Sequence, residues 1–378
     1  MKIKKIVAGI FCATAGACLL ANLGLTMYQM HASEFREEKI IDYVDMEIAR
    51  QTEENKKENT YLEDGYVVGE SYEIRSTTVI SDAYLSGDEH LLNDEEKETL
   101  KIASEILKEQ TKGCKNNYEK ELKIYEWMFK NIGQDGSNSV ALPTEVANVY
   151  TPYGVLKGRQ AVCVGYATTF RLFMNMLGME CHIVHNDYHS WDLVQLDDGE
   201  WYHVDVYNDV SDGCMHNCFN MSDGNAKLTS HEWDGSALPE AKGTTYTYPA
   251  QNVEELDDIY QIPKNVAKAL KKKKDGLFYH FRAPVSDETI NEVNMMVENM
   301  YGVIQEVSDY KTTMASSWWE DGEDGYILAI YLNRSIDVQK NNEDVVDKKK
   351  QKCIQKAIEK AFDVEIELND FNEETYEG

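Results

Sequence analysis

Positive charge is scarce in this chain. It has 38 lysine and arginine residues against 67 aspartate and glutamate residues, which gives a formal net charge of −29 at pH 7. Nucleic-acid binding requires a basic face for the phosphates, so the composition argues against nucleic acid as a partner. Cysteine is sparse as well, with eight in 378 residues, too few for a small disulfide-stapled domain. With 42% hydrophobic residues, the chain can still build a sizeable core.

Charge of either sign is missing from residues 6–30, which follow three lysines at the start of the chain. This length suits a membrane span of about 20 residues better than the shorter core of a signal peptide. The lysines before the span and Glu34 after it place the start in the cytoplasm and the bulk outside the membrane. We therefore expect residues 1–33 to be a signal-anchor of a single-pass membrane protein. The alternative is a cleaved signal ending near Ala32 and a secreted protein.

The patterns beyond this segment predict four further parts. We expect a strand over residues 77–80. A helix is predicted to begin at Asn93, with acidic residues in its first turn. The predicted parts are a stalk and N-terminal extension (34–90), a main domain (91–245), a charged linker (246–275) and a small α+β domain (276–378). Domains of about 100 residues are of ordinary size.

Cys163 is predicted to lie at the start of a helix, within the sequence Ala161-Val-Cys-Val-Gly-Tyr-Ala-Thr-Thr-Phe170. A helix N-terminus carries partial positive charge, so a thiol there ionises more readily than elsewhere. Its unpaired N–H groups can also hold a developing oxyanion. His189 and Asp205 follow in strand-like runs, and a cysteine, a histidine and a carboxylate are the parts of a nucleophilic triad.

The loop between these two strands decides whether His189 and Asp205 can meet. Asp197-Asp198-Gly199 predicts a hairpin. Because side chains alternate between the faces of a sheet, the two residues share a face only if the loop has an odd number of residues. A loop over residues 197–199 with Gly199 at positive φ makes His189 and Asp205 diagonal neighbours and puts His203 opposite Leu193. An even-numbered turn would separate the pair.

These segments resemble the transglutaminase-like superfamily of papain-type cysteine enzymes, as its exported bacterial members show it. The resemblance covers roughly residues 78–235. It rests on Tyr153-Gly154, Gly158, the run from Ala161 to Ala167, His189-Ser-Trp191, Gly199-Glu-Trp-Tyr-His-Val-Asp205, Phe219-Asn-Met-Ser-Asp223 and His231-Glu-Trp233. It implies an α+β fold in which a helix bearing the cysteine packs on an antiparallel sheet bearing histidine and aspartate, followed here by the smaller C-terminal α+β domain.

The resemblance also implies roles for individual residues. Cys163 is the nucleophile, His189 the general base and acid, and Asp205 the residue that orients the imidazole. Tyr153 is a candidate donor to the oxyanion, and Trp191 a candidate wall of the substrate site. The chain departs from the family's usual pattern at Asp192 and at Tyr207-Asn208. Those departures concern substrate fit more than the triad.

Four residues after the strands invite a metal-site interpretation: Cys214, His216, Cys218 and His231. One Cys-x3-Cys pair without a matched second pair does not predict a metal, and a local disulfide or two thiols is the simpler expectation. Thiol acyl chemistry needs no cofactor, so we expect none.

Three functions remain open from the sequence. The favoured one is an extracytoplasmic cysteine enzyme that hydrolyses peptide or glutamine amide bonds. A second is a transglutaminase, in which an amine resolves the same acyl-enzyme and cross-links proteins. A third is a non-catalytic binding module at the cell surface. The expected partner is a protein or peptide substrate, and the sequence leaves its identity, the oligomeric state and the role of the C-terminal domain open.

Overall fold

The computed structural model describes residues 63–69, 71–135, 148–307, 314–321, 325–332, 348–366 and 368. Contacts divide the chain into a unit of residues 1–60 and a unit of residues 61–378. The predicted anchor and most of the predicted stalk lie outside the described residues. Within the described ranges, no helix is both long and apolar enough to cross a membrane.

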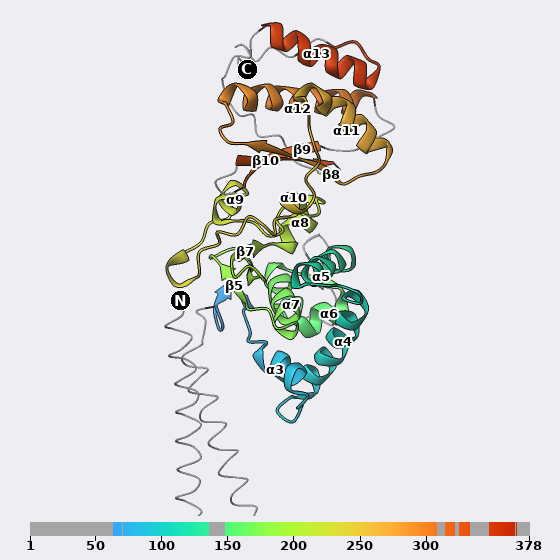
Figure 1. Cartoon of the computed structure of the whole chain (residues 1–378). Helices are drawn as coiled ribbons and strands as arrows, with labels where there is room; N and C mark the ends of the chain where they lie inside the picture. The colour runs from blue at the N-terminus through green and yellow to red at the C-terminus, as the bar shows by residue number, and fades with distance from the viewer. Residues whose placement is uncertain are drawn as a thin grey trace, which may run out of the picture. The chain divides into compact units, whose positions relative to one another are not determined.

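The described part of the main domain begins with helices that surround a central one. Asn93 caps one of them as predicted: its side chain accepts a hydrogen bond from the Glu96 N–H, and the Glu96 carboxylate accepts one from the Asn93 N–H. The helices before the central one are α3 (Thr78–Ser86), α4 (Asp94–Gln110), α5 (Asn117–Asn131) and α6 (Pro152–Gly158) (Figure 1).

The strand predicted over residues 77–80 is wrong, because Thr78 begins helix α3. Ile80 and Ala83 are buried three positions apart, and both pack into the hydrophobic core of the main domain. Gly87 ends the helix in the left-handed conformation, with φ of 74°. The sequence favoured a strand because residues 77–80 are mostly β-branched. Two apolar residues at helical spacing are too few to indicate a helix.

Helix α7 (Cys163–Met176) is the central element, and nearly every residue in it is buried. It packs against the preceding helices on one side and against a three-stranded antiparallel sheet on the other (Figure 1). The strands of that sheet are β5 (Cys181–His185), β6 (Ser190–Gln195) and β7 (Trp201–Val204), in the order β5-β6-β7. An apolar helix of this kind is stable only because other elements cover its whole surface.

The register of β6 and β7 is the predicted one. Leu193 lies opposite His203, and the Leu196 N–H donates to the Glu200 carbonyl, so residues 197–199 form the loop. Gly199 has φ of 81°, the left-handed conformation that this loop requires.

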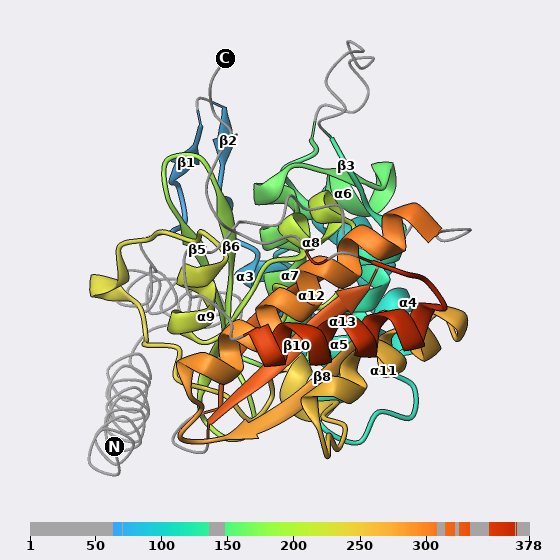
Figure 2. The same ribbon diagram turned by 90° about the horizontal axis from the view of Figure 1, so that it is seen from above.

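Two short pairs of strands border this core. A hairpin of β1 (Val67–Val68) and β2 (Tyr72–Glu73) lies beside the loop before β6, because the Gly69 N–H donates to the Asp187 carbonyl (Figure 2). The strands β3 (Gly133–Gln134) and β4 (Gln160–Ala161) pair in parallel immediately before Cys163.

Short helices follow the sheet and lead to the C-terminal part. They are α8 (Val206–Asp212), α9 (Asp223–Leu228), η2 (Gly235–Ala237), α10 (Tyr248–Gln251), η3 (Ile259–Gln261) and α11 (Ile262–Lys271). The segment expected to be a linker is therefore largely helical. Its apolar residues, among them Ile262, Val266 and Leu270, recur at helical spacing and are buried in the C-terminal core.

The C-terminal part is an antiparallel sheet with helices on one face, of the α+β type expected. Its strands are β8 (Gly276–Arg282), β9 (Met314–Glu320) and β10 (Gly325–Leu332), in the order β8-β10-β9. The helices α11, α12 (Asp287–Val307) and α13 (Lys348–Phe362) form its helical layer (Figure 1).

A joining cluster connects the two parts. It brings residues that follow β7 together with residues of the C-terminal sheet: Cys214, Cys218, Met221, Ala226, Phe278, Trp319, Ile327, Ala329 and Tyr331. The Tyr331 hydroxyl also lies 3.4 Å from the His216 carbonyl. Met221 connects this cluster to β7, since its backbone N–H and carbonyl both bond to His203.

Candidate active site

Cys163 is the first residue of helix α7, as the sequence predicted. The residue before it, Val162, has extended backbone (φ −86°, ψ 174°) and no side chain that caps the helix. The backbone of Val162 is held by a hydrogen bond from its N–H to the Val149 carbonyl. The uncapped first turn leaves its N–H groups available to an anion beside the Cys163 thiol.

His189 and Asp205 lie at the ends of β6 and β7, and the hairpin brings them together. His189 precedes β6, and Asp205 follows β7 and is the N-cap of α8. The His189 Nε2 atom lies 2.6 Å from Asp205 Oδ2. Asp205 Oδ1 accepts a hydrogen bond of 2.9 Å from the Asn208 N–H, so helix α8 holds the other carboxylate oxygen.

The charge of Asp205 keeps His189 protonated at neutral pH. Burial alone lowers the pKa of His189, but the Asp205 charge, its hydrogen bond and a hydrogen bond with Cys163 together raise it from 6.5 to about 10. Burial raises the pKa of Asp205, yet His189 and His231 outweigh burial and hold that pKa well below its usual value. The site therefore contains an imidazolium–carboxylate pair beside a thiol.

Trp191 supports the His189 ring from behind. It is only 1% exposed, and its ring stacks on that of His189 with centroids 5.6 Å apart and planes at 20°. The Trp191 Nε1–H donates to His203 Nδ1 at 3.0 Å, and His203 Nε2 donates to Asp223 at 2.9 Å. Trp191 is thus buried against the imidazole ring of His189.

Tyr153 has partners that differ from the expected oxyanion role. Its hydroxyl lies 3.2 Å from a carboxylate oxygen of Glu98, on α4, and 2.9 Å from the Lys157 ammonium. Tyr153 follows the cap of α6, so its direction is set by that helix and not by the start of α7. In this structure the Tyr153 hydroxyl links α6 to α4.

The side chain beside the thiol and the imidazole is Tyr207. Its ring centroid lies 5.6 Å from that of His189. Burial, followed by the nearby Cys163 and Asp205, raises the pKa of Tyr207. The sequence marked this position only as a departure from the family pattern.

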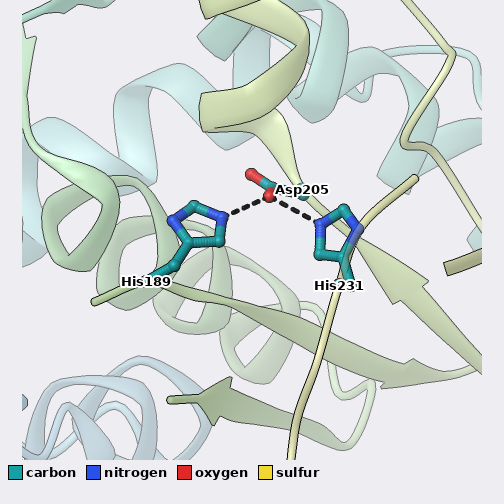
Figure 3. A group of neighbouring side chains, drawn as sticks. All are labelled: His189, Asp205 and His231. Carbon is teal, nitrogen blue, oxygen red and sulfur yellow. Dashed lines mark hydrogen bonds and ion pairs between the residues drawn. The ribbon is translucent and has the colours of Figure 1, made fainter. Parts of the chain in front are cut away.

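His231 is the residue whose place the sequence did not reveal. Its Nε2 atom lies 2.9 Å from Asp205 Oδ2, the same oxygen that His189 contacts, so the two imidazoles flank the carboxylate (Figure 3). His231 is 2% exposed and Asp205 is 1% exposed. The sequence marked His231 only as part of the His231-Glu-Trp233 motif and of the candidate metal set, and neither predicted its contact with Asp205.

The four residues that invited a metal-site interpretation do not form one group among the described residues. Cys214 and Cys218 lie in the joining cluster, and His216 stacks on Tyr248 with centroids 3.6 Å apart. His231 instead forms a group with His189 and Asp205 in which one ligand atom of each lies within 4.8 Å of the others. Its separations of 2.6 and 2.9 Å are those of N–H···O hydrogen bonds, with a proton between the atoms. These three residues offer N and O ligands that a metal ion could take only after the hydrogen bonds open.

A family model of the transglutaminase-like superfamily matches residues 104–206, which include Cys163, His189 and Asp205. This part of the chain is therefore a transglutaminase-like core within an α+β fold. A crystal structure of a TGase resembles the chain with 14% identity and a TM-score of 0.28, over 47% of this chain and 45% of that one. The chain thus covers less than half of that neighbour's length. No curated protein matches the chain.

Proposed function

We propose that the chain is a cysteine acyl-enzyme that hydrolyses peptide or glutamine amide bonds. The observation that carries the proposal is the hydrogen-bonded series from Cys163 through His189 to Asp205, placed at an uncapped helix start. The transglutaminase-like core supports it, because domains of this superfamily are usually enzymes. Cys163 and His189 are the catalytic residues, and Asp205 positions the imidazole.

The site supplies each group that the reaction needs. The Cys163 thiolate attacks the amide carbon, and the N–H groups at the start of α7 stabilise the oxyanion. The His189 imidazolium gives its proton to the leaving amine or ammonia, which leaves a thioester on Cys163. Neutral His189 then takes a proton from water, whose oxygen attacks the thioester, and the acid and the thiolate–imidazolium pair are regenerated.

We propose further that this reaction takes place outside the cytoplasm, on a protein or peptide at the cell surface. The support is the uncharged run over residues 6–30, with lysines before it and Glu34 after it. Protease digestion of intact cells that express a C-terminally tagged chain tests this. The tag is removed if the bulk lies outside, and its protection would contradict the proposal.

Alkylation of Cys163 by iodoacetamide tests the nucleophile. Because Cys163 begins helix α7 beside the His189 imidazolium, we expect it to react in the full chain at pH 6 at least about tenfold faster than the exposed Cys353. Mass spectrometry of the two peptides measures both rates in one sample. The Cys163→Ala variant identifies the signal, and equal rates at the two cysteines across pH 5–9 would refute the proposal.

Acyl transfer to an amine is the competing outcome after the same first step. Incubation of the full chain with casein and a fluorescent primary amine separates the two. Hydrolysis releases ammonia or new peptide ends without labelling casein, whereas cross-linking activity labels it. In either case Cys163→Ala must abolish the product, and a product that persists in this variant would exclude both forms of acyl-enzyme.

A further inference from the structure

Asp205 receives hydrogen bonds from three different segments of the chain. These are His189 at 2.6 Å from Oδ2, His231 at 2.9 Å from Oδ2, and the Asn208 N–H at 2.9 Å from Oδ1. Two imidazoles on one carboxylate oxygen are more than a Cys-His-Asp site needs. We propose that His231 is a positioning residue, which fixes Asp205 so that the carboxylate holds His189 in line with the Cys163 thiol. This inference rests on the proposed function.

The partners of His231 define which ring nitrogen carries the proton. Its Nε2 atom faces Asp205, an ionised acceptor, and therefore carries the hydrogen. Its Nδ1 atom lies 2.9 Å from the Thr229 hydroxyl and 3.3 Å from the Ala226 carbonyl oxygen, to which that hydroxyl also donates. His231 therefore donates from Nε2 to the same carboxylate oxygen that His189 contacts.

The backbone before His231 fixes the direction of its side chain toward Asp205. Helix α9 ends at Leu228, and Ser230 takes the left-handed conformation with φ of 64°. The backbone N–H of His231 then donates to the Ala226 carbonyl at 3.0 Å. A serine is rarely left-handed without constraint, so this turn marks a fixed direction for the next side chain.

Packing holds the His231 ring on the side of Asp205 opposite His189 (Figure 3). Its edge meets the Trp191 ring, with centroids 4.8 Å apart and planes at 69°. The side-chain amide of Asn208 lies 3.3 Å from Nε2. Both imidazoles therefore contact the same tryptophan and the same carboxylate, which couples the orientation of His189 to the presence of His231.

Alkylation of Cys163 in the full chain measures this coupling without knowledge of the substrate. We expect His231→Ala to slow iodoacetamide alkylation of Cys163 at pH 6 about tenfold, as loss of an orienting partner does at other sites. His231→Gln can still donate an N–H to Asp205, and we expect it to recover most of the rate. His216→Gln is the matched control, since His216 is also 2% exposed but its ring stacks on Tyr248, away from Asp205.

The results separate this inference from the proposed function. If Cys163 of the unmodified chain reacts no faster than Cys353, the proposed function fails. If it reacts fast, and His231→Ala lowers only the melting temperature while the rate and its pH profile are unchanged, His231 has a structural role alone and the inference fails.

A spectroscopic measurement detects the proton on His231 Nε2 directly in the unmodified chain. In the ¹⁵N-histidine-labelled chain, with the His231 signals assigned by their loss in His231→Gln, we expect Nε2 to carry a proton, because it faces the Asp205 carboxylate. The opposite tautomer would place the proton away from Asp205 and would overturn the inference.

Discussion

At the scale of single residues, Asp205 determines the charge state of the site. It is buried, its pKa is held low by two histidines, and its charge raises the pKa of His189 to about 10. Replacing Asp205 by asparagine removes this charge and nearly keeps the shape. We expect this change to affect the pKa of His189 more than that of any other residue.

Asp205→Asn tests this through the pH dependence of stability. The His189 pKa rises from 6.5 to about 10 on folding, so its stabilising contribution is complete below pH 6.5 and is lost as the pH rises through about 10. We expect the difference in free energy of unfolding between the unmodified chain and Asp205→Asn to shrink over this range. Urea denaturation at pH 6, 8 and 10 measures it, and a constant difference would contradict the assignment.

The sequence predicted the His189–Asp205 contact because it depends on local parity. Two strands and a loop with Gly199 are sufficient to fix it. The place of His231 depends instead on where α9 ends and on the left-handed Ser230, which residue types alone do not specify. The contact of the Tyr153 hydroxyl with Glu98 was not predicted either, since the two residues are far apart in the sequence.

At the scale of elements, the start of α7 depends on the close approach of the Val149 backbone. A Cβ atom on Gly165 would lie 2.0 Å from the Val149 carbonyl oxygen, which is the acceptor for the Val162 N–H. Only glycine lets the helix pass this close to that backbone. The close packing at Gly165 therefore helps to hold Val162, the residue immediately before Cys163.

We expect Gly165→Ala to destabilise the fold by roughly 1–3 kcal/mol, because the methyl group must displace backbone. It should also slow alkylation of Cys163 by moving the first turn of α7. Gly302→Ala is the matched control: it lies in helix α12 with no atom within 4 Å of an added Cβ, and we expect it to stabilise slightly. Thermal unfolding followed by circular dichroism compares the two, and equal effects would contradict the steric argument.

At the scale of the whole molecule, the joining cluster makes the main domain and the C-terminal sheet depend on each other. Trp319 is buried at 2% exposure in this cluster, which includes Met221. Met221 in turn is bonded through its backbone to His203, the partner of Trp191. The sequence predicted the two α+β parts but not their contact. No local pattern of residues indicates which face of the C-terminal sheet packs against Met221.

We expect Trp319→Ala to cost about 3–5 kcal/mol, as large-to-small changes in a core do. The lost contacts lie between the two cores. We therefore expect calorimetry to show one unfolding transition for the unmodified chain and two for Trp319→Ala. Tyr326→Ala, on the same sheet but 39% exposed, should leave a single transition. A single transition at lower temperature in Trp319→Ala would mean that other contacts suffice to couple the two parts.

The three-residue loop between β6 and β7 has a consequence for how such chains can vary in evolution. Inserting or deleting one residue there turns His189 and Asp205 to opposite faces, whereas a change of two residues restores them. Natural variants of this hairpin that keep the site should therefore differ in loop length by even steps. Loop length normally varies freely in a hairpin. Here, whether two related chains differ by an even or an odd number of loop residues indicates whether the site has been retained.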